Sequence, residues 1–200
     1  GSNGENSEVP CEKHAYQENY VVALISESKR LQLVPYREHH VAKYHGWMQD
    51  EAMLEATASE AMSLKEEYAM QQMWRDDPKK ITFILLLGDA LVQELSKDRD
   101  VGGSETDRMV GDVNLFLHDP DDPSNAEIEV MVAEPTFRRL GVAREALLML
   151  MRYGVHALGV TRYFAKIGTD NAPSLALFKT LGYVEVNYVA AFREHELALT

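Results

Sequence analysis

Cysteine is almost absent from this sequence of 200 residues, in which Cys11 is the single one. One cysteine excludes an internal disulfide framework and is typical of proteins in a reducing compartment. Because Cys11 lies in a polar N-terminal stretch, we do not expect it to act as a nucleophile. The hydrophobic content of 46% is enough for a sizeable core, so we expect a folded chain.

The sequence also lacks any hydrophobic run that approaches the roughly 20 residues of a membrane-spanning helix. Its opening residues, Gly1-Ser2-Asn3-Gly4, have neither the basic region nor the apolar core of a signal peptide. Gly1-Ser2 is instead typical of the scar that a removed expression tag leaves. We predict a soluble, cytoplasmic chain without a membrane partner.

Positive charge is scarce, because 20 Lys and Arg residues stand against 32 Asp and Glu residues, for a net charge of −12. Binding of duplex nucleic acid requires clustered positive charge, so we expect no nucleic-acid partner. The excess of negative charge is compatible with two roles. It either serves solubility alone or attracts a cationic partner, such as a protonated amine or a basic peptide.

The length of the chain fits one domain. Residues 1–19 are polar, and we expect them to form a flexible N-terminal segment before a single α/β domain over residues 20–200. Apolar or alternating runs predict strands at 21–25, 31–34, 81–87, 109–117, 127–133, 162–167, 183–192 and 193–199. Helical spacing predicts helices at about 38–50, 63–76, 141–158 and 172–181.

Three local features refine this prediction. Ser63 and Glu66 form a capping box at the start of the second helix. The spacing of Tyr68, Met70, Met73 and Trp74 in that helix is typical of core packing. Residues 88–108 are polar and glycine-containing, and we expect a long connection between two strands there. The strand-helix-strand order that follows predicts parallel pairing across the first crossover.

The strongest functional signal is the turn Arg138-Arg139-Leu140-Gly141-Val142-Ala143, which opens an amphipathic helix after a strand. A helix N-terminus offers unpaired N–H groups and the positive end of the helix dipole. Small residues at 141 and 143 let the backbone approach a bulky anion, and the arginines add charge. The turn therefore predicts an anion cradle that suits a pyrophosphate. It lacks the motifs of P-loop and dinucleotide sites, so by itself it does not identify one nucleotide.

Two blocks resemble the GNAT superfamily of N-acetyltransferases. Arg138-x-x-Gly141-x-Ala143 is similar to its [QR]-x-x-G-x-[GA] motif, and the stretch from Asn171 to Leu181-Gly182-Tyr183 is similar to its second signature. The two blocks are separated by one helix and one strand, as in that fold. The upstream stretch from Arg30 to Asp50 resembles the branch that acetylates ribosomal-protein N-termini and polyamines. The resemblance covers residues 21–199 and implies an α/β GNAT fold, with a single mixed, mostly antiparallel sheet of about seven strands and flanking helices.

The resemblance implies that acetyl-CoA is the cosubstrate and that an amine of a protein, a peptide or another acceptor receives the acetyl group. It implies that the pantetheine arm contacts the strand at Val132 and Ala133. The backbone amides of Arg138, Arg139, Leu140, Gly141, Val142 and Ala143 would hold the pyrophosphate. Asn171, Ser174 and Phe178 match coenzyme-facing positions of the second signature. Asn171 is equally suited to capping the helix that follows it, and the two roles are compatible.

Acetyl transfer to an amine needs a base for the amine and a proton for the leaving thiolate. Glu127 and Glu129 are two apart on a predicted strand, so both side chains point to one face and raise each other's pKa. Some superfamily members place the base at the position of Glu127, which makes it the first candidate and Glu129 the second. The alternative is that both carboxylates line a solvated face. Many members carry Tyr in place of Phe178, so here Ser174 or water would supply the proton, or the thiolate would leave unassisted.

Three functions remain open: a protein or peptide acetyltransferase, a small-molecule (polyamine-like) acetyltransferase, and a non-catalytic acyl-CoA-binding protein. An open groove lined by Glu51, Glu55 and Glu60 would favour peptides, and a closed acidic pocket would favour small amines. We expect no metal, because the adjacent His39 and His40 should diverge on a helix and no further ligand supports them. The sequence leaves the oligomeric state open.

Overall fold

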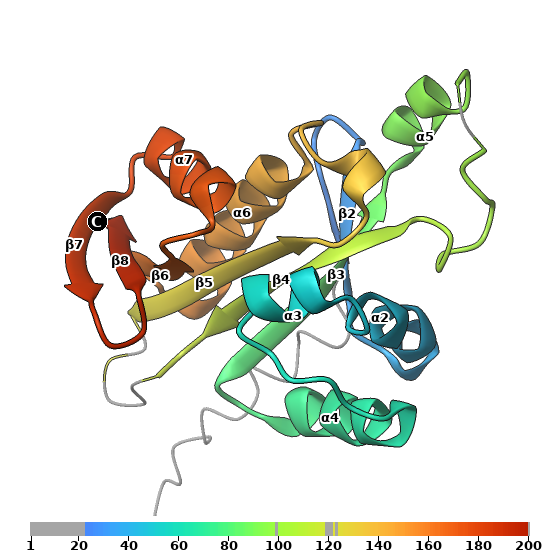
Figure 1. Ribbon diagram of the computed structural model, residues 1–200. Helices are drawn as coiled ribbons and strands as arrows, with labels where there is room; N and C mark the ends of the chain where they lie inside the picture. Colours follow the sequence, from blue (N-terminus) through green and yellow to red (C-terminus); the bar gives the residue numbers. More distant parts are fainter. Residues whose placement is uncertain (1–22, 99, 119–121, 123, 200) are drawn as a thin grey trace, which may run out of the picture.

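The computed structural model describes residues 23–98, 100–118, 122 and 124–199, so the segment expected to be flexible (residues 1–19) lies outside the described residues. The described chain forms one eight-stranded sheet with the order β1-β2-β3-β4-β5-β6-β8-β7 (Figure 1). Among these strands β5 and β6 pair in parallel and all other neighbours are antiparallel. The predicted sheet and its parallel pair are therefore confirmed, with eight strands in place of about seven. The strands are β1 (Leu24–Ile25), β2 (Leu31–Pro35), β3 (Lys80–Leu87), β4 (Met109–Phe116), β5 (Asn125–Val132), β6 (Arg162–Gly168), β7 (Val184–Val189) and β8 (Glu194–Leu199).

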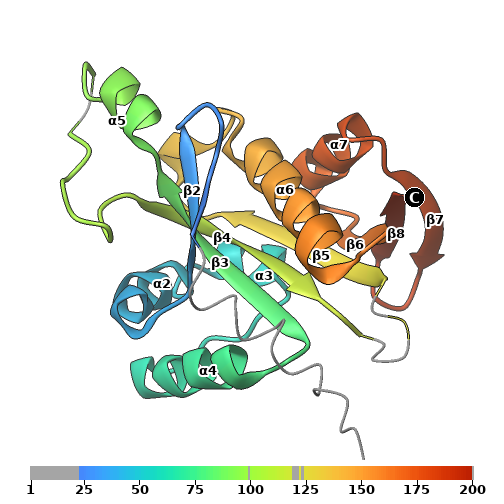
Figure 2. The ribbon, with the colours of Figure 1, turned by 180° about the vertical axis from the view of Figure 1, so that it is seen from behind.

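Helices cover both faces of the sheet. Figures 1 and 2 show α2, α3 and α4 on one face, α6 and α7 on the other, and α5 away from both groups. None of the helices in the described part of the chain has the length and apolar character to cross a membrane. The helical elements are η2 (Glu38–His40), α2 (Val41–Trp47), α3 (Glu51–Ala56), α4 (Leu64–Asp76), α5 (Asp89–Leu95), η3 (Pro135–Phe137), α6 (Val142–Tyr153), the π-helical turn η4 (Gly154–Leu158) and α7 (Ala172–Thr180).

Strand β3 shows how the sheet separates two hydrophobic cores. Its residues from Ile81 to Leu87 are all buried, because helices cover both faces. Side chains alternate along a strand, so Phe83 packs into the core under α6, whereas Ile84 packs into the core under α2 and α4. Site residues on the central strands therefore divide between these two faces.

Two helices differ from the sequence prediction. The helix expected at 38–50 is formed by η2 and α2 and ends earlier, at Trp47. The sequence prediction missed α3, which begins after Asp50, whose side chain accepts a hydrogen bond from the Met53 amide. Residues 88–108 are not a plain connection, because they include α5. Leu91 and Leu95 of α5 are buried four residues apart, a stripe that the polar residues around them obscure in the sequence.

Helix α4 starts at Ser63 with the predicted capping box. Its packing differs from the prediction at Met73, whose relative exposure is 69%. Tyr68, Met70 and Trp74 are partly buried and pack against the core under α2 and α4, while the fully buried residues of the helix are Glu67 and Gln71. The spacing of large apolar residues therefore identified the helix correctly but misplaced part of its buried face.

The separation of β5 from β6 is the feature that creates a site. The two strands are paired from Asn125 to Glu127 on β5, and the last matched pair is Glu127 with Phe164. Beyond it, β5 stays paired with β4 up to Val132, and β6 stays paired with β8 up to Gly168. In the described chain, no pairing joins the two strands past this point, so the sheet opens between them.

Candidate active site

A cleft of about 750 Å³ opens where β5 and β6 separate. Residues from both faces of the sheet line it, so it connects the α6 and α7 side of the sheet with the α2, α3 and α4 side. On the α6 and α7 side the lining includes Ala165, Ile167, Asn171, Ser174 and Phe178. On the other side it includes Tyr44, Glu55, Trp74, Lys80, Asp112, Asn114, Glu127 and Glu129.

The predicted anion cradle lies at the exposed N-terminus of α6 (Figure 1). Arg139 and Gly141 both have positive φ, at 64° and 82°, a backbone form that turns successive amides towards a common point. Gly141 is the N-cap and provides no side-chain cap, so the first amides of α6 have no side-chain partner there. Arg30, on the turn before β2, stabilises this loop by donating a hydrogen bond to the Leu140 carbonyl at 3.4 Å.

Fewer backbone groups of β5 face the cleft than the sequence predicted. The Ala133 amide donates to the Val110 carbonyl at 2.8 Å, so it points towards β4. Because backbone groups alternate between the two edges of a strand, those of Val130 and Val132 point away from β4. The Val132 carbonyl accepts a hydrogen bond from Arg138 Nε at 3.0 Å. Of the two predicted pantetheine contacts, Val132 has backbone groups on the open edge, while the Ala133 amide is already paired.

The start of α7 also lines the cleft. The Asn171 side chain accepts a hydrogen bond from the Ser174 amide at 3.2 Å, so the predicted helix cap is confirmed. Ser174 is half-buried beside the cleft. Phe178 is buried and packs edge-to-face on Tyr183, with ring centres 4.9 Å apart. The Tyr183 hydroxyl does not replace the missing phenol, because it donates to Met151 Sδ at 3.2 Å in the core.

Glu127 is buried and held by two side chains that the sequence did not connect to it. Its Oε2 lies 3.1 Å from Lys166 Nζ and 2.5 Å from His118 Nε2. Burial lowers the pKa of Lys166, but the hydrogen bond and negative charge of Glu127 outweigh this effect and raise the pKa above its usual value. The period-two alternation of β6 could have placed Lys166 on this face, whereas nothing local indicated His118.

Replacing Lys166 with methionine is expected to lower the free energy of unfolding by about 1–3 kcal/mol, because it removes one partner of a buried carboxylate. Chemical denaturation at neutral pH measures this change. Lys179→Met on the exposed surface of α7 is the matched control, and we expect it to change stability by less than about 0.5 kcal/mol. Equal stabilities of the two variants would contradict a structural role for the pair.

Glu129 has a different environment, although it lies on the same face of β5. It stays accessible to solvent through the cleft and pairs in register with Asn114. Desolvation by the surrounding walls, and then the charge of Glu127, raise the pKa of Glu129 to about 7, against the lowering effects of Lys80 and Lys166. A carboxyl group with this pKa accepts a proton near neutral pH.

A buried chain of hydrogen-bonded polar side chains lies beside Glu129 on the neighbouring strands. The Thr82 hydroxyl donates to Asn114 Oδ1 at 2.6 Å, and Asn114 Nδ2 donates to Asp112 Oδ2 at 3.0 Å. The Tyr44 hydroxyl donates to the same Asp112 oxygen at 3.3 Å. Burial raises the pKa of Asp112, and the hydrogen bond from Asn114 opposes this shift. Sequence patterning missed this chain because alternation predicts which face a residue shares but not which polar groups meet.

Helix α3 and the turn after it form the outer wall of this side of the cleft. The lining includes Ala52, Glu55 and residues 56–59. Of the three glutamates expected along a groove, Glu55 lines the cleft, while Glu51 and Glu60 lie outside its lining. The predicted acidic groove is therefore only partly formed by these residues, and the other carboxylates of the lining are Asp112, Glu127, Glu129, Asp170 and Glu194.

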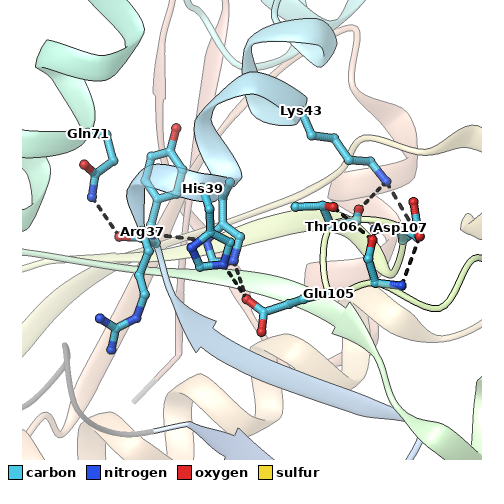
Figure 3. Close-up of polar contacts among 10 residues, drawn as sticks. Arg37, His39, Lys43, Gln71, Glu105, Thr106 and Asp107 are labelled. Atoms are coloured by element: carbon cyan, nitrogen blue, oxygen red, sulfur yellow. Dashed lines mark hydrogen bonds and ion pairs between the residues drawn. The ribbon is translucent and has the colours of Figure 1, made fainter.

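The prediction that His39 and His40 diverge is wrong. They lie on the 3₁₀ turn η2, and both Nε2 atoms point at Glu105 Oε1, at 2.8 and 2.7 Å (Figure 3). Three such side chains could suggest a metal site. However, His40 Nδ1 accepts the Arg37 amide at 3.0 Å, so the ring proton is assigned to Nε2, where a metal would need a lone pair. The geometry therefore favours a hydrogen-bonded clamp over a metal site.

This clamp of His39, His40 and Glu105 joins η2, which directly precedes α2, to the turn before β4. Lys43 of α2 donates to the Thr106 carbonyl at 2.8 Å in the same turn (Figure 3). One helical turn further, Trp47 Nε1 donates to Glu134 Oε1 at 2.9 Å. Glu134 lies two residues after the end of β5, so α2 connects the turn before β4 with the start of the loop that leads to the anion cradle.

Comparison with known proteins identifies the family. The model of the acetyltransferase (GNAT) domain matches residues 30–184. The chain is 48% identical over 176 residues to an N-acetyltransferase 9-like protein of Nematostella vectensis, which covers 88% of this chain and 84% of that protein. It is 45% identical over 173 residues to the alpha/beta-tubulin-N-acetyltransferase 9 of Homo sapiens, covering 86% of this chain and 81% of that protein.

Solved structures share the fold at low sequence identity. Spermidine N-acetyltransferase from Vibrio cholerae, in complex with CoA and spermine, has a TM-score of 0.69 at 13% identity, covering 85% of this chain and 95% of that chain. The ribosomal L7/L12 alpha-N-protein acetyltransferase RimL has a TM-score of 0.69 at 15% identity, covering 88% and 92%. The GNAT resemblance carried by Arg138-x-x-Gly141-x-Ala143 is thus confirmed. Blocks such as Val110 to Leu117 also resemble N-acetyltransferase 9 in the sequence, and the relatives of that name confirm this likeness. The chain belongs to the GNAT family of acetyl-CoA-dependent N-acetyltransferases.

Proposed function

We propose that this enzyme transfers the acetyl group from acetyl-CoA directly to an amine of a protein or peptide. The observation that carries the proposal is the cleft between β5 and β6, which connects the two faces of the sheet. Acetyl-CoA and the acceptor can therefore enter from opposite faces and meet at the opening. Direct transfer needs this convergence, because no covalent enzyme intermediate carries the acetyl group between two sites.

The donor side is formed by the α6 and α7 face. The amides from Arg138 to Ala143 hold the pyrophosphate at the N-terminus of α6. The open edge of β5, with the backbone groups of Val130 and the amide of Val132, pairs with the amides of the pantetheine arm. Asn171, Ser174 and Phe178 flank the thiol end, where the Phe178 ring forms an apolar wall.

The acceptor side contains the base, and we assign that role to Glu129 in preference to Glu127. The Glu127 carboxylate is already paired with the side chains of Lys166 and His118. Glu129 is open to the cleft and has a pKa of about 7. As the amine nitrogen forms its bond to the thioester carbonyl carbon, Glu129 takes the amine proton, directly or through one water. The C–S bond then breaks, and Ser174 or water returns a proton to the thiolate.

The acceptor is most simply a protein amine, with tubulin as the first candidate, because the human relative is named for alpha/beta-tubulin. The acidic lining of the cleft suits a cationic chain end. It also suits a polyamine, the ligand named for the Vibrio cholerae neighbour, which keeps a small-molecule acceptor as the alternative. A cytoplasmic location, which the single cysteine supports, is part of the same proposal.

Release of CoA with a panel of acceptors tests the proposal. The panel contains N-terminal and lysine peptides of tubulin, unrelated peptides, spermidine and spermine. We expect turnover with peptides, and mass spectrometry of the products locates the new amide on an α-amine or a lysine. Turnover with polyamines alone would select the small-molecule alternative. Measurable acetyl-CoA binding without turnover of any amine would overturn the enzymatic proposal in favour of a binding protein.

A further inference from the structure

The turn between β1 and β2 lies beside the loop that opens α6, as Figures 1 and 2 show. Arg30, which directly precedes β2, contacts two segments that are distant in the sequence. Its Nη1 lies 2.8 Å from Glu94 Oε2 on α5, and its Nη2 donates to the Leu140 carbonyl at 3.4 Å. One guanidinium group therefore connects α5 with the loop that forms the predicted anion cradle.

Backbone contacts hold Arg30 in this place. The Arg30 carbonyl accepts a hydrogen bond from the Gly88 amide at 2.8 Å, and the Lys29 carbonyl accepts one from the Ala90 amide at 3.1 Å. Gly88 is the N-cap of α5, and a Cβ at this position would overlap the Lys29 carbonyl oxygen, so the close approach requires glycine. The main chain of the turn is thus joined to the start of α5, the same helix that carries Glu94.

The contact with Leu140 determines the direction of the neighbouring amide. In a planar trans peptide the carbonyl and the N–H point in opposite directions, so the Gly141 N–H points away from Arg30 when the Leu140 carbonyl accepts from Arg30. The Gly141 carbonyl accepts the Glu145 amide at 3.0 Å and begins the helical hydrogen bonds of α6. The Gly141 amide therefore belongs to the N–H groups at a helix N-terminus that an anion can bind.

Glycine leaves this peptide unit free to turn. Gly141 has a φ of 82°, and glycine adopts positive and negative φ about equally well. Rotation of the unit between Leu140 and Gly141 would reverse the directions of both the carbonyl and the N–H. The hydrogen bond from Arg30 favours the orientation in which the carbonyl faces the turn before β2. It thereby fixes the direction of the N–H before the coenzyme binds, which lowers the cost of binding.

We propose that Arg30 is a positioning residue for the pyrophosphate of acetyl-CoA and that Glu94 orients it. Arg30 acts through the peptide unit between Leu140 and Gly141, so its effect falls on coenzyme binding and not on the transfer step. Glu94 gives α5 a role in the same site. The inference rests on the proposed pyrophosphate site at the start of α6.

Positive charge alone would also make Arg30 attract an anion, and Glu94 separates the two effects. If charge dominates, removal of the Glu94 carboxylate leaves Arg30 less neutralised and should strengthen acetyl-CoA binding. If position dominates, loss of the 2.8 Å contact lets the guanidinium leave the Leu140 carbonyl and should weaken binding. We expect position to dominate, because the side chains of Arg30 and Glu94 are 33% and 56% exposed and water screens their charges.

Calorimetric titration of the full chain with acetyl-CoA tests the inference without an acceptor. We expect Arg30→Met to weaken acetyl-CoA binding by about 5- to 10-fold and Glu94→Met by about 3- to 5-fold, within the effect of one net hydrogen bond. Arg152→Met is the matched control. Arg152 lies 2.8 Å from Glu27 of the same turn, but it is about 16 Å along α6 from Gly141. Its replacement should change the affinity by less than about twofold.

A donor without the pyrophosphate separates positioning from general damage to the fold. S-acetylpantetheine carries the thioester but not the phosphates, so its kcat/KM with the best peptide should be the same in Arg30→Met and in the wild-type enzyme. With acetyl-CoA, the KM of Arg30→Met should rise while kcat stays unchanged. An equal loss with both donors would make Arg30 a structural residue and overturn the inference. Unchanged affinity of Arg30→Met, or tighter binding by Glu94→Met, would overturn it as well.

The inference fails separately from the proposals on which it rests. Wild-type affinity in Arg30→Met beside weakened binding in Gly141→Val sinks the role of Arg30 alone. Wild-type affinity in both variants sinks the pyrophosphate site together with the inference. A wild-type chain that binds acetyl-CoA but acetylates no amine sinks the transferase proposal, and the calorimetric test of Arg30 still applies.

Discussion

Glutamine in place of Glu129 is expected to lower kcat/KM for the acceptor by about 10²- to 10⁴-fold, the range that a positioned general base contributes. The amide has nearly the shape of the carboxylate but accepts no proton at neutral pH. Affinity for acetyl-CoA should stay unchanged, because Glu129 lies on the acceptor side of the cleft. Steady-state kinetics with the best peptide, together with titration of acetyl-CoA, measures both quantities.

The pH dependence provides an independent readout of the same group. The pKa of Glu129 is about 7, and the base is active when it is ionised. The rate of the wild-type enzyme should therefore fall about tenfold per pH unit below pH 7 and level off above it. The Glu129→Gln enzyme should be slow at every pH and should no longer show this fall in rate below pH 7, which we call the acidic limb.

Two further variants make the assignment of the base falsifiable. Glu60→Gln changes a glutamate outside the cleft lining and should leave kcat/KM unchanged. Glu127→Gln should mainly reduce stability, because it weakens a buried ion pair with Lys166. A folded Glu127→Gln enzyme that loses the acidic limb, beside a Glu129→Gln enzyme that keeps it, would transfer the role of base to Glu127.

The second large effect is expected at Gly141. Its φ of 82° suits glycine, and valine there introduces strain of about 1–3 kcal/mol. Relief of that strain turns the backbone of the loop, so the amides at the start of α6 no longer point at the pyrophosphate. We expect Gly141→Val to weaken acetyl-CoA binding by about 5- to 150-fold, the same free energy expressed as a ratio. Isothermal titration calorimetry measures the change.

Gly159 provides a matched control. It has a φ of 73° and lies beyond the C-terminal end of α6, and a Cβ at either glycine meets nothing within 4 Å. Gly159→Val should therefore reduce stability about as much as Gly141→Val does, while acetyl-CoA affinity stays at the wild-type level. Equal affinities of the two variants would show that the conformation of residue 141 does not control coenzyme binding.

Local chemistry in the sequence was enough to predict much of the fold. Strand alternation, the capping box at Ser63 and the Asn171 cap depend on residues close together in the chain, and the structure confirms them. The Arg138 to Ala143 turn also belongs to this class, because a helix N-terminus with small residues is defined within six positions. For the same reason, the family could be identified from two short blocks before any tertiary contact was known.

Local patterns failed where burial depends on distant segments. The helix α5 was missed because its burial comes from contacts outside the window that a helical period samples. His39 and His40 converge because one carboxylate oxygen of Glu105, more than 60 residues away, lies within hydrogen-bond distance of both Nε2 atoms. These errors share one cause, since sequence spacing describes a face of an element but not what covers it.

By itself the sequence determined the sheet, the turn from Arg138 to Ala143 at the start of α6 and the presence of two carboxylates on one face of β5. Only the tertiary structure decided how those carboxylates differ. The side chains of Lys166 and His118 pair with the Glu127 carboxylate, whereas Glu129 remains open to the cleft with its pKa raised to about 7. The physical reason is that strand geometry places neighbouring side chains on a face, while desolvation and ion pairing depend on β4, β6 and α4, which the chain brings together only on folding.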